Sequence, residues 1–98
     1  MALKPDKMSP EELAINALVW LAGDETLMRR FLDLSGIDAS QIRQAAQEPA
    51  FLAGVLQFIV AHEPTLTAFA TGAGIHASSV TKALQALPGG DQDIFHST

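Results

Sequence analysis

The sequence predicts an all-α protein of about six helices, and three observations lead to this prediction. Apolar residues recur every three or four positions along most of the chain, which is the spacing of one helix face. Capping residues, prolines and glycines divide the chain into pieces of helical length. No window shows the sustained alternation of β-branched and polar residues that is typical of a strand. The chain has 98 residues, 48% of them hydrophobic, which suffices for one modest core.

The first predicted helix begins with the clearest signal in the sequence. Ser9 and Glu12 have the spacing of a capping box, and Pro10 occupies the first helical position, where its missing N–H is tolerated. Apolar residues follow at helical spacing until Gly23, which we expect to end the helix.

The next two helices each begin at an aspartate. Asp24 caps a second helix, which we expect to end at Gly36, because glycine readily adopts the left-handed conformation that follows a last turn. Asp38, with Gln41 three residues later, begins a third helix. This helix is expected to run to about Gln47, because a proline two residues further on disfavours helical geometry in the residue before it.

The second half of the sequence predicts three more helices. A helix over 49–61 begins at a proline and is apolar nearly all round. A short helix over 63–71 follows, and we expect Gly72 and Gly74 to end it. The last helix is expected over 77–87.

An internal repeat emerges when the sequence is shifted on itself by 38 residues. The turns at Gly36 and Gly74 then align, and both read Gly-Ile-x-Ala-Ser. We interpret the alignment as two three-helix units, residues 11–48 and 49–87, packed into one orthogonal helical bundle. Two unrelated helical hairpins that each end on glycine would also align in this way.

Both ends of the chain are predicted to be flexible, on either side of a single helical domain over 9–87. Residues 1–8 lack the apolar run of a secretory signal, and residues 88–98 are mostly polar after a Pro-Gly-Gly turn. The longest apolar stretch, residues 50–61, has about 12 residues, whereas a membrane span needs about 20. We therefore expect a cytoplasmic protein.

The core is expected to draw on all six helices, with the helix over 49–61 at its centre. A helix that is apolar nearly all round is either enclosed by the other helices or shared with a second copy of the chain. The expected core residues are Leu18, Leu21, Leu27, Phe31, Ile42, Leu52, Val55, Leu56, Ile59, Phe69, Val80 and Leu84.

Composition argues against most kinds of catalytic site. The sequence has no cysteine, which excludes disulfides, thiolate zinc sites and cysteine nucleophiles. His62, His76 and His96 are too far apart in sequence to form a helical metal-binding pair, and His76 stands where a helix cap is expected. The sequence predicts no catalytic residue, no metal, no cofactor and no small-molecule ligand. A site formed by residues that are distant in sequence and meet only in the folded protein is the one exception that the sequence leaves open.

One alternative function is suggested by the turns themselves. A helix-turn-helix motif has a small residue, a glycine four positions later and a β-branched residue six further on, as in Ala70, Gly74 and Val80. The first hairpin has the same spacing, but Leu32 replaces the small residue and should push the two helices apart.

DNA-contacting residues in this alternative lie on the helix after the first turn. Ser40, Gln41, Arg43 and Gln44 can all hydrogen-bond to base edges. Against DNA binding, the net charge is −5, and Lys82 is the only cation of the second hairpin. Much of the affinity of a protein for DNA comes from contacts between phosphates and cationic side chains, and this sequence has few such side chains.

The leading hypothesis is a non-catalytic module that binds a protein partner or a second copy of itself. Residues 44–81 contain only Glu48 and Glu63 as formal charges, and such a stretch must cover its apolar atoms with a core or a partner. If the stretch is an interface, replacing its surface residues, which we expect to include Gln57 and Thr67, with lysine should weaken binding.

Several short segments together carry a family resemblance that covers residues 9–87. They are Ala22-Gly23-Asp24, Arg30-Phe31-Leu32, Ser35-Gly36-Ile37, Pro49-Ala50-Phe51-Leu52-Ala53-Gly54-Val55-Leu56, and Phe69 followed by Gly74-Ile75. In combination they resemble domain of unknown function family 3572, a set of short helical bacterial proteins. The resemblance implies a standalone all-α protein. It implies no activity, cofactor or catalytic residue.

Overall fold

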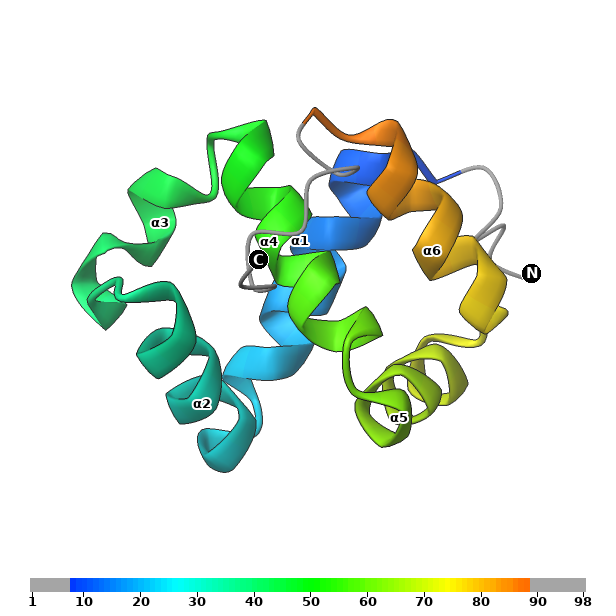
Figure 1. The fold of residues 1–98 in the computed structure, drawn as a ribbon, viewed down its shortest axis with the longest axis horizontal. Coiled ribbons are helices and arrows are strands. Elements are labelled where there is room, and N and C mark those ends of the chain that lie inside the picture. Colours follow the sequence, from blue (N-terminus) through cyan, green and yellow to red (C-terminus); the bar gives the residue numbers. More distant parts are fainter. Residues whose placement is uncertain (1–7, 89–98) are drawn as a thin grey trace, which may run out of the picture.

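The structure is a computed structural model that describes residues 8–88, and within this range the chain is all-α, as predicted (Figure 1). The flexible ends predicted at 1–8 and 88–98 lie outside the described residues, apart from Met8 and Pro88. The elements are α1 (Pro10–Ala22), α2 (Glu25–Ser35), the 3-10 turn η2 (Ala39–Gln41), α3 (Ile42–Ala45), α4 (Pro49–Val60), α5 (Glu63–Ala73) and α6 (Ala77–Ala86).

The predicted caps begin the first two helices. The Ser9 hydroxyl accepts a hydrogen bond from the backbone N–H of Glu12 at 3.1 Å, and the Ser9 N–H donates to the Glu12 carboxylate at 3.0 Å. The carboxylate of Asp24 accepts from the N–H of Leu27 at 3.1 Å. Each bond satisfies a backbone group that the helix leaves without a partner.

Left-handed glycines end α2 and α5. Gly36 has φ of 74° and Gly74 has φ of 72°, and among residues 8–88 only these two have positive φ. The N–H of Ile75 bonds back to the carbonyl of Ala70 at 3.0 Å, which closes the last turn of α5. The prediction for Gly72 was wrong: this residue lies inside α5, which continues to its C-cap at Gly74.

Replacing Gly74 with alanine should cost about 1 kcal/mol of unfolding free energy, because an L side chain is strained at this φ. A Cβ built there meets nothing within 4 Å, so the cost is conformational rather than steric. Gly72→Ala is the matched control: it lies in a helix, with Trp20 Nε1 at 3.8 Å from the added Cβ, and should stabilise by up to about 1 kcal/mol. Urea denaturation measures both. Equal stability of Gly74→Ala and the parent would contradict the left-handed turn.

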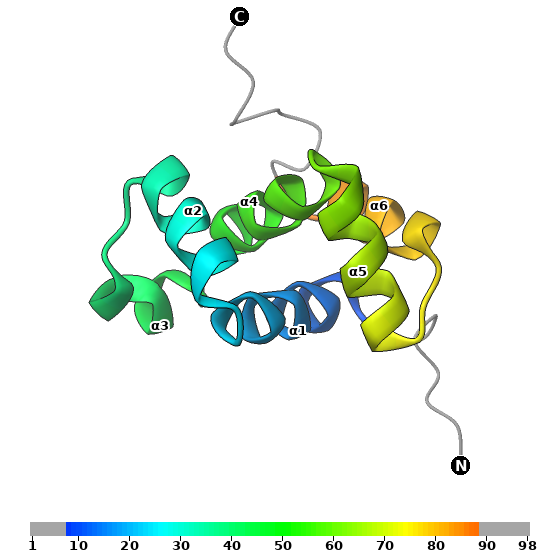
Figure 2. The ribbon, with the colours of Figure 1, turned by 90° about the horizontal axis from the view of Figure 1, so that it is seen from below.

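The helices are arranged around a central pair. In Figures 1 and 2, α1 and α4 lie in contact at the middle of the molecule, with α2 and α3 toward one end and α5 and α6 toward the other. The helix α4 is enclosed within the chain, since every residue from Leu52 to Ile59 is buried. The single chain therefore covers α4, the first of the two arrangements that its apolar sequence allowed.

Aromatic rings connect the outer helices to this centre. Phe31 of α2 meets Phe51 and Phe58 of α4 edge to face, with ring centroids 5.7 and 5.4 Å apart. Trp20 of α1 meets Phe69 of α5 in the same way at 5.4 Å. Such pairs stabilise by about 0.5–1.5 kcal/mol beyond the burial of their area.

The third helix is shorter than predicted. Instead of one helix over 38–47, the chain forms η2 and then the four-residue α3. The N–H groups of Gln47 and Glu48 bond three residues back rather than four, and Glu48 is extended before the proline. Because this segment lies at the edge of the fold, Ile42 of α3 is only half-buried. Leu27 of α2 is also half-buried, and both side chains pack against the core. The other predicted core residues are buried.

The two halves of the chain share element boundaries offset by 38 residues. The helices α2 and α5 both have eleven residues and begin at Glu25 and Glu63, and η2 and α6 begin at Ala39 and Ala77. Their third elements differ, because the ten-residue α6 corresponds to the broken η2 and α3. The common packing of two repeats stays a prediction from the sequence.

No single helix among residues 8–88 has the length and apolar composition to cross a membrane. The helices α4 and α5 meet those criteria only when taken together, and their axes are bent by 108° at the break between them.

Candidate protein-interaction groove

The residues that could carry acid–base or metal chemistry do not converge. His62 Nδ1 lies 2.7 Å from Thr65 Oγ1 at the start of α5, whereas His76 stands at the N-cap of α6 without a side-chain capping bond. His96 lies outside the described residues. Within 8–88 no three metal-ligating side chains gather, and no buried side-chain nitrogen or oxygen lacks a hydrogen-bond partner.

The four residues predicted to read DNA are exposed but face two separate hollows. Ser40 and Arg43 line a hollow shared with α1, whereas Gln41 and Gln44 line another beside Phe51 of α4. They lie on η2 and the four-residue α3. A recognition helix presents several residues from one face to the major groove, and the structure does not bring these four side chains onto one face.

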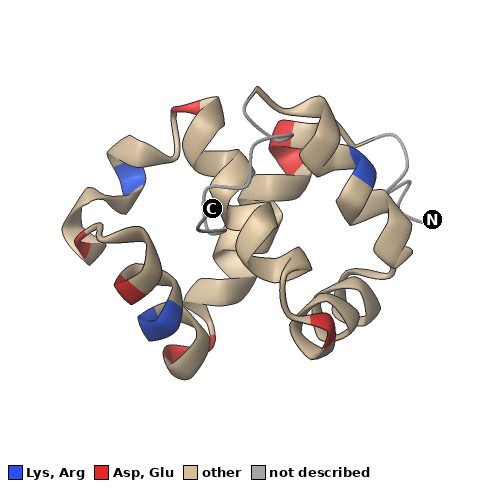
Figure 3. Cartoon of the chain, in the orientation of Figure 1, with Lys and Arg blue, Asp and Glu red and all other residues tan. Residues whose placement is uncertain are grey.

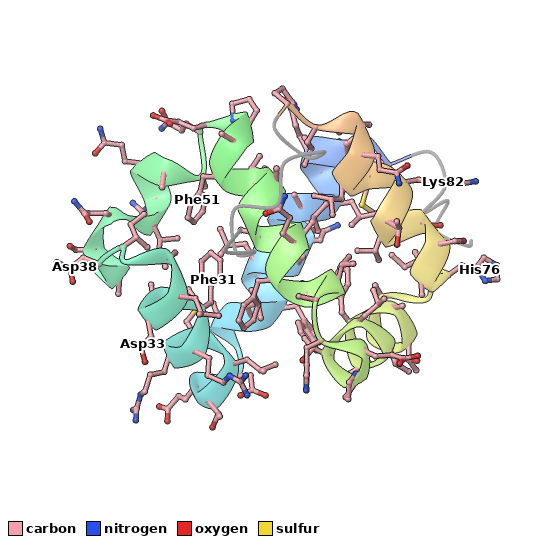
Figure 4. All side chains as sticks on the ribbon, in the orientation of Figure 1. Phe31, Asp33, Asp38, Phe51, His76 and Lys82 are labelled. Carbon is pink, nitrogen blue, oxygen red and sulfur yellow. The ribbon has the colours of Figure 1, made fainter. Side chains whose placement is uncertain are left out.

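The second hairpin has a longer second helix and little charge. In Figure 4, His76, the N-cap residue of α6, and Lys82 within α6 point away from the body of the protein. Both line a hollow of about 490 Å³ beside the start of α1. A single lysine there supplies little of the cationic surface that phosphate binding requires.

The charge-poor stretch at 44–81 is explained mainly by the core. Most of its buried apolar residues belong to α4, in which every residue from Leu52 to Ile59 is buried. The interpretation of Gln57 as a surface residue was wrong, because it is only 7% exposed. A nearly all-apolar helix has no solvent side, so its one polar residue is buried with its neighbours. Thr67 is exposed, as expected.

The large exposed apolar side chains lie elsewhere, and two of them are on α1. Ile15 is 43% exposed and Val19 is 66% exposed. The buried face of α1 is formed by Leu13, Ala14, Ala17, Leu18 and Leu21. At about 100° per residue, Ile15 and Val19 point away from the centre of that buried face. Placing the α1 sequence on a helical wheel would have revealed this second apolar stripe.

A hollow of about 730 Å³ adjoins Val19 and forms what we call the α1–α3 groove. Its lining is apolar apart from Ser40 and Arg43, and no acidic residue contributes to it. Figure 2 shows α3 beside the C-terminal part of α1, the arrangement that creates the groove. The lining residues are Leu18, Val19, Ala22, Met28, Ala39, Ser40, Ile42, Arg43 and Ala46.

A second apolar hollow lies between α2 and α4. It has a volume of about 410 Å³, with Phe31 and Phe51 in its lining (Figure 4). Its exposed large apolar member, Leu34, is 58% exposed. Leu34 gives a matched control for Val19, since both are exposed apolar residues on helices.

The fold and the groove together define a small all-α domain with an uncovered apolar surface. The family described as Protein of unknown function (DUF3572) matches residues 7–90. The chain belongs to this family, as the sequence resemblance indicated. No curated protein and no solved structure matches the chain.

Proposed function

We propose that the protein is a non-catalytic interaction module that binds another polypeptide chain in the α1–α3 groove. The observation that carries the proposal is the exposure of Val19 at the edge of a hollow lined mostly by apolar side chains. Contiguous apolar surface of this kind favours contact with a partner.

A polypeptide fits this groove better than a small ligand does. Small-ligand sites are concave and use a few convergent polar groups to fix orientation. Here the polar groups are Ser40 and Arg43, and the apolar surface continues onto the outward face of α1 at Ile15. Burying the exposed part of Val19 would contribute about 1–2 kcal/mol. A helix or strand laid along α1 could cover both α1 side chains at once.

The proposal predicts that Val19→Lys removes binding while leaving the fold intact, because the side chain projects into solvent in the free protein. Tagged wild-type protein, Val19→Lys and the control Leu34→Lys are used to capture partners from lysate, with and without nuclease. We expect wild type and Leu34→Lys to retain a polypeptide, either a different protein or an untagged copy. Val19→Lys should retain at least about tenfold less, because a lysine would have to be buried without a partner.

Two results would overturn this proposal. Equal capture by Val19→Lys and wild type would show that the groove is not the interface. Recovery of DNA that disappears after nuclease treatment would favour the alternative function through Ser40, Gln41, Arg43 and Gln44, whose affinity should fall steeply with salt.

A further inference from the structure

We propose that the polypeptide bound in the α1–α3 groove is a second copy of this chain, with the two α1 helices antiparallel about a two-fold axis. The inference rests on the proposed function, because it names the occupant of the same groove. It is carried by the distribution of charge along the exposed face of α1 and at the end of the groove.

One exposed face of α1 changes from acidic to apolar along the helix. Glu11, Ile15, Val19 and Ala22 are all exposed. With about 100° of rotation per residue, these four positions fall within about 80° of one another on the helix surface. The stripe therefore begins with a carboxylate in the first turn and continues with apolar side chains to the end of the helix. We call it the α1 stripe.

The groove presents a cation beside the other end of the stripe. Ala22, the last residue of the stripe, and Arg43 of α3 both line the groove. Within residues 8–88 Arg43 has no ion-pair partner. Figure 3 shows a basic position on α3 and acidic positions at the start of α1. Arg43 lies beside Ala22 at the end of α1, whereas Glu11 lies eleven residues earlier in the same helix, about 16 Å along it, so Arg43 and Glu11 of one chain are not neighbours.

Antiparallel pairing brings these opposite charges together between two chains. An axis that passes midway between Ile15 and Val19 places Ile15 of each copy opposite Val19 of the other. At 1.5 Å per residue, Glu11 lies about 9 Å from the axis along the helix and Ala22 about 8 Å on the other side. The carboxylate of one copy therefore reaches the groove end where Arg43 of the other copy lies.

A second copy offers an opposite charge to both Glu11 and Arg43, because each chain supplies both side chains. A two-fold axis makes each contact twice, so two carboxylate–guanidinium pairs flank one apolar centre of four side chains. Complementary charges at the rim fix the register of the two helices.

The test uses charge reversal on the purified full-length chain, with the dimer dissociation constant measured by sedimentation equilibrium. Glu11→Arg alone and Arg43→Glu alone should each weaken dimerisation about tenfold or more, because each creates two like-charge contacts per dimer. An equimolar mixture of the two variants should form a heterodimer with an affinity near that of wild type. In that heterodimer the two substituted side chains face each other as an opposite-charge pair, and the native Glu11 of one chain faces the native Arg43 of the other.

The controls separate this arrangement from general effects of charge. Asp33→Arg reverses an exposed charge on α2 and should leave dimerisation unchanged, and so should Leu34→Lys, whereas Val19→Lys should produce monomers. Circular dichroism of each variant checks that it is folded, which we expect because the substituted positions are exposed.

Three outcomes would overturn the inference. If the wild-type protein stays monomeric up to about 0.1 mM, the proposed dimer does not form at that concentration. A dimer that ignores both charge reversals, or one that Leu34→Lys dissociates, would place the interface elsewhere. These results can be distinguished from failure of the proposed function. If the protein is a monomer that still captures a different protein through Val19, the dimer proposal falls and the proposed interaction function stands. If Val19→Lys changes neither measurement, both proposals fall.

Discussion

Replacing Phe31 with alanine is expected to lower the free energy of unfolding by about 3–5 kcal/mol, a large part of the stability of a domain this small. Phe31 is 1% exposed and is the one residue of α2 that is buried. Its ring contacts Phe51 and Phe58 of α4 edge to face. Removing it leaves a cavity and also releases the main contact that holds α2 against the centre of the fold.

Urea denaturation followed by circular dichroism measures the effect of this substitution. Phe31→Leu keeps most of the volume but loses both ring contacts, so it should cost clearly less than Phe31→Ala. Because Phe31 also lines the hollow between α2 and α4, the alanine variant should enlarge that hollow. A cost below about 1 kcal/mol for Phe31→Ala would contradict the burial of this ring.

Replacing Gln57 with lysine is expected to lower the free energy of unfolding by about 2–4 kcal/mol. The substitution replaces a buried amide, whose polar atoms have hydrogen-bond partners, with a charged group. Gln57 is 7% exposed within α4, and its amide is not left without a partner. The lysine stem can carry its ammonium part of the way to solvent, which keeps the cost below that of a fully buried ion.

Thr67→Lys is the matched control, since Thr67 is a polar residue exposed on α5. It should change stability by less than about 0.5 kcal/mol. Thermal denaturation of the two variants side by side distinguishes them. Similar melting temperatures for both lysine variants would show that α4 is not enclosed as the structure has it. A loss of partner binding in Gln57→Lys would reflect unfolding rather than a lost contact.

The enclosure of α4 changes which helix an interface would use. Its apolar sequence left open whether α4 is enclosed by the other helices or shared with a second copy, and all residues from Leu52 to Ile59 are covered within one chain. Of the large apolar residues left exposed within residues 8–88, Ile15 and Val19 belong to α1 and Leu34 belongs to α2. Mutations at the proposed interface therefore fall on exposed positions, so they test binding without removing the core.

The sequence by itself determined the all-α class, the start of each helix and the glycine turns. These features depend on local chemistry: the Ser9 and Asp24 side chains bond to backbone groups three residues away, and left-handed turns at Gly36 and Gly74 need glycine. The sequence signals for helix boundaries were weakest over residues 38–47, where the chain has few apolar contacts. There the predicted third helix proved to be η2 followed by the short α3.

Only the tertiary structure decided which apolar residues are covered and where a groove remains. A hydrophobic pattern states that α1 and α4 are apolar over much of their surface, but burial depends on which neighbours surround each helix. Packing on all sides covers α4, including Gln57, whereas α1 is left open on the side of Ile15 and Val19. The groove with Arg43 exists because α3 lies beside the end of α1, a contact between segments about twenty residues apart that no local pattern encodes.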